Sequence, residues 1–237
     1  MDNLSAFNRS AAASAQVRYD EGLRRHMLGI YRNMGIGLAI TGVIALLVAS
    51  SPPLVALIFG TPLKWVAMLA PLAFVFFFTF RIERMTTAGA RATFFAFAAV
   101  MGVSMASIFL VFTGTSIAMA FFTAAAMFAG LSLWGYTTRR DLTGMGTFLF
   151  VGLIAVIGAS LINLFLGSSL LQMALSVVGV VVFAGLTAWD TQRLKSEYVV
   201  YGNSQASEKL AIMGALSLYL NLINMFQLLL GLMGERE

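Results

Sequence analysis

The chain has 237 residues, of which 59% are hydrophobic and only 11% are charged, and its mean hydropathy is +0.88. Soluble domains carry about 25% charged residues, so this composition excludes an ordinary soluble protein and predicts an all-α membrane protein. There is no cysteine and only one histidine, His26, which argues against disulfides, thiolate metal sites and a Ser-His-Asp triad. We therefore expect no enzyme and no bound cofactor.

The first 28 residues are polar and lack the apolar core of a signal peptide. Val17, Leu23, Met27 and Ile30 are loosely spaced as on an amphipathic helix. Two interpretations follow: a helix lying along the cytoplasmic membrane surface, or a basic tail without fixed structure. In either case we expect a cytoplasmic N-terminal segment over 1–28 and a transmembrane domain over 29–237.

Seven apolar runs follow, each close to the roughly 20 residues that cross a bilayer as a helix. The runs are continuously apolar rather than alternating, which favours helices over the strands of a β-barrel. The predicted spans are residues 33–50, 63–80, 92–112, 117–136, 146–166, 170–189 and 210–233. Together they predict a seven-transmembrane-helix bundle.

The charged residues predict the orientation of the bundle. If the N-terminus is cytoplasmic, all 15 lysines and arginines except Lys64 and Arg236 lie on the cytoplasmic side. The C-terminus is then extracytoplasmic. The net charge of +5 is explained by this topology, so we expect no nucleic-acid partner.

The seventh run carries a stripe of small and polar residues on one face. Its members share heptad-like spacing: Gly214, Ser217, Asn221, Asn224 and Leu228. Amides in a bilayer need partners, so this stripe must face protein or water, and the seventh helix should be central. The stripe is either a packing surface or the lining of a pore, in which case Ser217 and Asn224 are candidate polar pore or ligand residues.

Asp190 closes the sixth run and is the other candidate site residue. It is either a harmless interfacial carboxylate or the chemically active group of the protein. The small residues before it favour burial, and the hydroxyls of Thr187 and Thr191 lie close in sequence. Such oxygen ligands suit Ca²⁺ or protons, and a single carboxylate predicts a weak, transient Ca²⁺ site suited to passage.

Three stretches carry a resemblance to a known family. The segments "GLTAWDTQRLK" (185–195) and "ALSLYLNLINMF" (215–226), with the loop "LWGYTTRRDLTGMG" (133–146), resemble the Bax inhibitor-1 family, also called transmembrane Bax-inhibitor-motif or lifeguard proteins, and its bacterial members. The resemblance implies seven helices with a central seventh, and a bacterial inner-membrane location. It also implies a pH-sensitive calcium leak channel, in which two aspartates share a proton near the cytoplasmic mouth and an arginine latches one of them.

Residue by residue, the resemblance matches Asp190 to the first aspartate and Arg81, in "FTFRIERM", to the latch arginine, with Arg84 as the alternative. Asn221 stands where the family has the second aspartate. An Asp–Asn pair lacks the like-charge repulsion that tunes a carboxylate dyad, so we expect a weakened pH response.

Two functions follow from these observations. The first is passive cation flux, with Ca²⁺ or H⁺ as the permeant ion, gated around Asp190. The alternative is a non-conducting regulator that binds another membrane protein, such as a membrane-bound protease or a stress-response partner.

Overall fold

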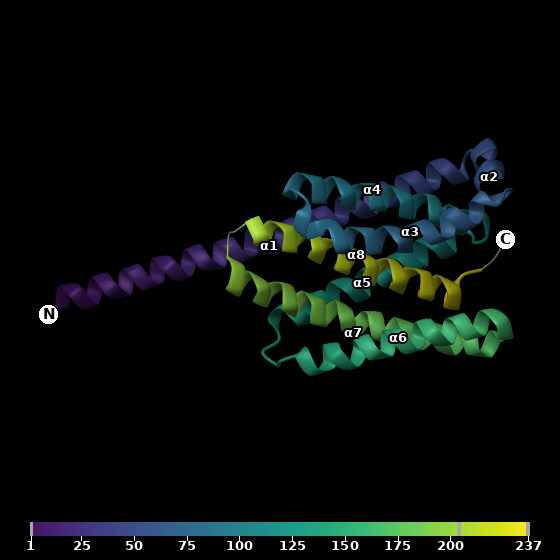
Figure 1. Ribbon diagram of the computed structural model, residues 1–237. Coiled ribbons are helices and arrows are strands. Elements are labelled where there is room, and N and C mark those ends of the chain that lie inside the picture. Colours follow the sequence, from purple (N-terminus) through teal and green to yellow (C-terminus); the bar gives the residue numbers. More distant parts are fainter. Residues whose placement is uncertain (1, 203–204, 236–237) are drawn as a thin grey trace.

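The computed structural model describes the backbone of residues 2–202 and 205–235, and the side chains of 20–202 and 207–235. Within these ranges the fold is entirely helical (Figure 1). The helices are α1 (Asp2–Ala49), α2 (Pro52–Phe59), α3 (Leu63–Arg81), α4 (Thr87–Met105), α5 (Gly114–Thr137), α6 (Thr143–Leu166), α7 (Ser169–Tyr201) and α8 (Gln205–Met233), with 3₁₀ segments η1 (Ile82–Arg84) and η2 (Ala106–Leu110).

Seven of these helices are long and apolar enough to cross a bilayer, which confirms the predicted seven-helix membrane bundle. Their outward faces carry large apolar side chains, among them Phe165 (90% exposed) on α6 and Phe122 (70%) on α5. Exposed aromatic residues on this scale require lipid rather than water as the surrounding medium.

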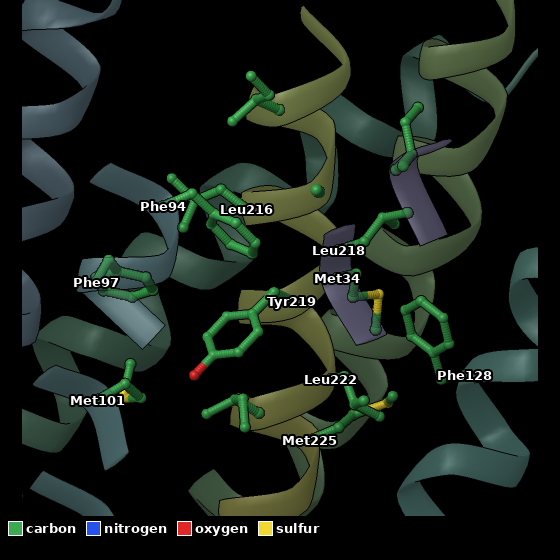
Figure 2. Close-up of a cluster of buried hydrophobic side chains, with 14 of the residues drawn as sticks. Met34, Phe94, Phe97, Met101, Phe128, Leu216, Leu218, Tyr219, Leu222 and Met225 are labelled. Carbon is green, nitrogen blue, oxygen red and sulfur yellow. The ribbon is translucent and has the colours of Figure 1, made fainter. Parts of the chain in front are cut away.

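The seventh span, α8, is the centre of the bundle, as predicted. It packs against α7, α5, α1 and α4, and Leu218, Tyr219 and Met225 have no exposed surface. Figure 2 shows Tyr219 directed toward the α4 rings; its centroid lies 5.9 Å from that of Phe94 and 5.7 Å from that of Phe97, both edge-on.

The N-terminal boundary expected at residue 28 does not coincide with an end of a helix, because α1 is continuous from Asp2 to Ala49. Leu23 and Met27 are buried, so the last part of the predicted tail belongs to the bundle. Earlier in the chain α1 projects away from the other helices (Figure 1). The amphipathic stripe begins at Val17, whose side chain lies outside the described residues, so membrane-surface contact by this segment stays a prediction.

Two further elements differ from the expected spans. Helix α2 lies between the first two expected spans, where no helix was predicted. Pro52 and Pro53 fit the first turn of a helix, and Ile58 is buried against the core. Helix α7 continues past Trp189 to Tyr201, since Leu194 and Tyr198 repeat at helical spacing and are both buried.

Candidate functional site around Asp190

Close helix packing brings α7 against its neighbours near Asp190. A Cβ at Gly135 of α5 would lie 2.2 Å from the Ala188 carbonyl oxygen, so only glycine allows this approach. A Cβ at Gly214 of α8 would lie 2.3 Å from the Leu194 side chain on α7. Asp190, between these two contacts along α7, is 3% exposed.

The predicted stripe of α8 faces α7 at this point. Both Asp190 and Asn221 are buried, and the Asn221 Nδ2 donates to the Asp190 Oδ2 at 2.8 Å. The Ser217 hydroxyl, one helical turn earlier, donates to the same oxygen at 2.6 Å. The structure therefore brings together three of the residues singled out from the sequence.

The arginine that pairs with Asp190 is Arg193, not Arg81. Its Nη2 lies 2.8 Å from the Asp190 Oδ1, and its Nη1 lies 3.6 Å from a Glu197 carboxylate oxygen. The side chain of Arg193 is 37% exposed, whereas Arg81 is exposed at the end of α3. The i,i+3 spacing of Asp190 and Arg193 on one helix was the signal in the sequence that would have identified this pair.

The other candidate oxygen ligands are used elsewhere. The Thr187 hydroxyl donates to the Phe183 carbonyl and the Thr191 hydroxyl to the Thr187 carbonyl, both at 2.8 Å. The Asn224 amide donates to the Leu220 carbonyl of its own helix at 2.8 Å. These three side chains donate to backbone carbonyls of their own helices, so they do not form a ligand set around the Asp190 carboxylate.

A hydrogen-bonded chain beside the site was not anticipated. Thr191 lies 3.0 Å from the Ser132 hydroxyl of α5, which lies 2.5 Å from the Tyr31 hydroxyl of α1. No local sequence pattern reveals it, because the three residues come from three different helices.

The site does not fit a tight Ca²⁺ centre. Such a centre requires six to eight oxygens, commonly from several carboxylates. Among the described residues there is no group of three or more His, Cys, Asp or Glu side chains that could hold a metal. Both carboxylate oxygens of Asp190 already accept hydrogen bonds. A cation at this carboxylate would therefore compete with Arg193 and the α8 donors for its oxygens.

A family model described as inhibitor of apoptosis-promoting Bax1 matches residues 23–237, which includes every residue of this site. The chain belongs to the Bax inhibitor-1 family. The matched region begins at Leu23, the first buried apolar side chain described on α1.

Bacterial relatives cover nearly the whole chain. It is 46% identical over 224 residues to the uncharacterized protein RP147 of Rickettsia prowazekii, covering 94% of this chain and 95% of that one. It is 39% identical over 219 residues to the inner membrane protein YbhL of Escherichia coli, covering 91% and 94%. It is also 32% identical over 220 residues to the uncharacterized membrane protein SpyM3_0260 of Streptococcus pyogenes, covering 92% and 96%. This Bax inhibitor-1 family protein is thus an integral membrane protein, with an inner membrane protein among its relatives.

Proposed function

We propose that the protein conducts cations passively, calcium among them, and that Asp190 is the gate of the path. The observation that carries this proposal is a carboxylate buried between α7 and α8, at an interface within a transmembrane bundle. Burying an ionisable residue inside such a bundle costs free energy, and such residues tend to mark ion or proton pathways. Family membership supports the same function, because the resemblance to the Bax inhibitor-1 family implies a calcium leak channel.

The hydrogen bonds of Asp190 support a closed gate. Arg193 neutralises one carboxylate oxygen, and Ser217 and Asn221 occupy the other. Two of the three donors lie on α8, so a separation of α7 from α8 would free the carboxylate for a passing cation. The Arg193 side chain is 37% exposed, so this partner borders solvent while it pairs with the carboxylate.

Asn221 gives this gate its own pH behaviour. Its amide donates to Asp190 at any pH, whereas an aspartate in the same place would have to share a proton. We therefore expect conduction that varies little with pH near neutrality.

Calcium flux into liposomes that contain the purified protein tests the proposal, at pH values of about 6, 7 and 8, which span the range where a carboxylate dyad would titrate. Asp190→Asn should change the flux, and Asn221→Asp should create steep pH dependence by restoring a carboxylate pair. Asn224→Asp is the matched control, because it makes the same change on the same helix at an amide bonded to its own backbone. If the parent and all three variants conduct no better than empty liposomes, the proposal is refuted.

A second candidate, the binding of another membrane protein such as a membrane-bound protease, is favoured by the part of α1 that projects from the bundle (Figure 1). Deleting residues 2–19 tests it, because the deletion stops short of the buried Leu23 and Met27. A partner that copurifies with the full chain and is lost with the deletion would support this function. Unchanged copurification would exclude the projecting segment as the binding site.

A further inference from the structure

A basic groove lies beside the gate, between the α5–α6 loop and α7. It has a volume of about 480 Å³ and is lined by three arginines, Arg139, Arg140 and Arg193, and by one carboxylate, Asp141. The Trp189 side chain also lines it, with the Arg193 guanidinium 5.1 Å from the ring centroid. Positive charge therefore predominates in this groove.

The groove has a fixed wall, because Gln192 ties the loop to α7. The Gln192 Oε1 accepts from the Leu142 N–H, and its Nε2 donates to the Arg140 carbonyl, both at 2.8 Å. One side chain thus holds the loop backbone at two points. Because the loop backbone is held at these two points, Arg139 and Arg140 stay close to Arg193.

Of the three arginines of this groove, only Arg193 is paired, with Asp190 and Glu197, in the part of the chain that the structure describes. The Asp141 carboxylate is occupied by Thr143, accepting from its N–H at 2.9 Å and from its hydroxyl at 2.6 Å. Among the described residues, no carboxylate lies within salt-bridge distance of Arg139 or Arg140. Two guanidinium groups are therefore available to an external anion.

The position of the groove indicates which class of anion it binds. It opens where α5 ends at Thr137 and α6 begins at Thr143, at the ends of two membrane spans, which is the depth of lipid phosphates. Guanidinium groups match phosphate oxygens in pairs. Directly along α6, Phe148 (76% exposed) and Val151 (61%) present an apolar surface on which acyl chains can lie.

We propose that this groove binds the phosphate of an anionic phospholipid headgroup, and that the headgroup competes with Asp190 for Arg193. The guanidinium of Arg193 both lines the groove and donates to the Asp190 Oδ1. A phosphate held by Arg139 and Arg140 would draw this third guanidinium away from the carboxylate. The lipid would then act on the gate of the proposed function, although its binding does not depend on that function.

Trp189 provides a reporter inside the groove. The other two tryptophans, Trp65 and Trp134, are 59% and 44% exposed on outward helix faces, so Trp65→Phe and Trp134→Phe together leave Trp189 as the single tryptophan of the full-length chain. The emission of Trp189 is followed in detergent micelles while dioctanoyl phosphatidylglycerol is added. Parallel titrations use dioctanoyl phosphatidylcholine and inorganic phosphate.

The expected result is saturable binding of phosphatidylglycerol, with far weaker binding of phosphatidylcholine and of inorganic phosphate. Arg139→Gln with Arg140→Gln should weaken binding about thirtyfold. The matched control is Arg24→Gln with Arg25→Gln, another adjacent exposed pair that does not line the groove, and it should leave the affinity unchanged.

The competition is tested through the reciprocity of linked equilibria. If the lipid weakens the Asp190–Arg193 pair by some factor, that pair must weaken lipid binding by the same factor. Asp190→Asn should therefore bind phosphatidylglycerol at least about fivefold more tightly. Unchanged affinity in this variant would overturn the competition.

Three other outcomes overturn the binding site: equal affinity for the two lipids, equal losses in the two arginine-pair variants, or inorganic phosphate binding as tightly as the lipid. All of these are binding measurements and do not depend on conduction. If the protein binds the lipid but conducts no cation, the proposed function is refuted and the lipid site is not.

Discussion

The hydrogen bond from Asn221 to Asp190 should contribute measurably to stability, and its size follows from its surroundings. Hydrogen bonds between membrane helices contribute about 0.6 kcal/mol on average and up to about 1.7. Bonds to charged groups reach about 1.5–3 kcal/mol. The donor and the acceptor are both buried, at 5% and 3% exposure, and the N–O distance is 2.8 Å, so we expect a coupling energy near the overlap of these ranges, about 1.5 kcal/mol.

A double-mutant cycle measures this coupling. The free energy of unfolding is obtained by SDS titration in mixed micelles for the parent, Asn221→Ala, Asp190→Ala and the double variant. A parallel cycle uses Asn224→Ala, because the Asn224 amide bonds only its own helix backbone among the contacts described, and its coupling to Asp190 should be near zero. Equal coupling in the two cycles, or less than about 0.5 kcal/mol for Asn221, would refute the argument.

Three further predictions concern packing, capping and topology. Gly135→Ala should lower the free energy of unfolding by about 1–3 kcal/mol, because its Cβ would lie 2.2 Å from the Ala188 carbonyl oxygen. Gly130→Ala is the control on the same helix: its Cβ meets nothing within 4 Å, so it should be neutral or stabilising. Thermal unfolding compares the two variants. Hydrogen bonds from the Thr143 hydroxyl and N–H lower the pKa of Asp141. The ionised Asp141 carboxylate therefore stabilises the fold above the ordinary carboxyl pKa, and this stabilisation is lost as the pH falls through the lowered pKa. Asp141→Ala should therefore destabilise the protein more at about pH 7 than at about pH 2, and equal melting-temperature differences at both values would contradict this. Because the chain lacks cysteine, one cysteine placed in the α5–α6 loop should react with an impermeant maleimide only from the cytoplasmic side, and labelling from the outside would reverse the predicted topology.

The helices were predictable because their signal is local. Continuous apolar runs of the right length identify seven spans, and the polar stripe at Ser217 and Asn221 identifies α8 as central, since amides cannot face lipid. Helix α2 was missed because its eight residues are too short to cross a bilayer and its two prolines also suit a turn.

The site was predictable only in part. The contact of Asp190 with Asn221 was expected from the resemblance to a known family, while the partner Arg193 required attention to spacing along a single helix. The chain from Thr191 through Ser132 to Tyr31 depends on how three helices are rotated about their axes. Helix rotation follows from side-chain packing across interfaces, which hydropathy does not encode.

The central position of α8 has a consequence for how the protein is made. The ribosome produces this helix after the other six spans, so they enter the bilayer before the element around which they pack exists. During that interval Asp190 has its own-helix arginine but lacks Ser217 and Asn221. A chain that terminates before α8 is therefore not a smaller bundle. It is a set of helices without its core and with a half-paired carboxylate in the membrane, which is the kind of product that membrane quality control degrades.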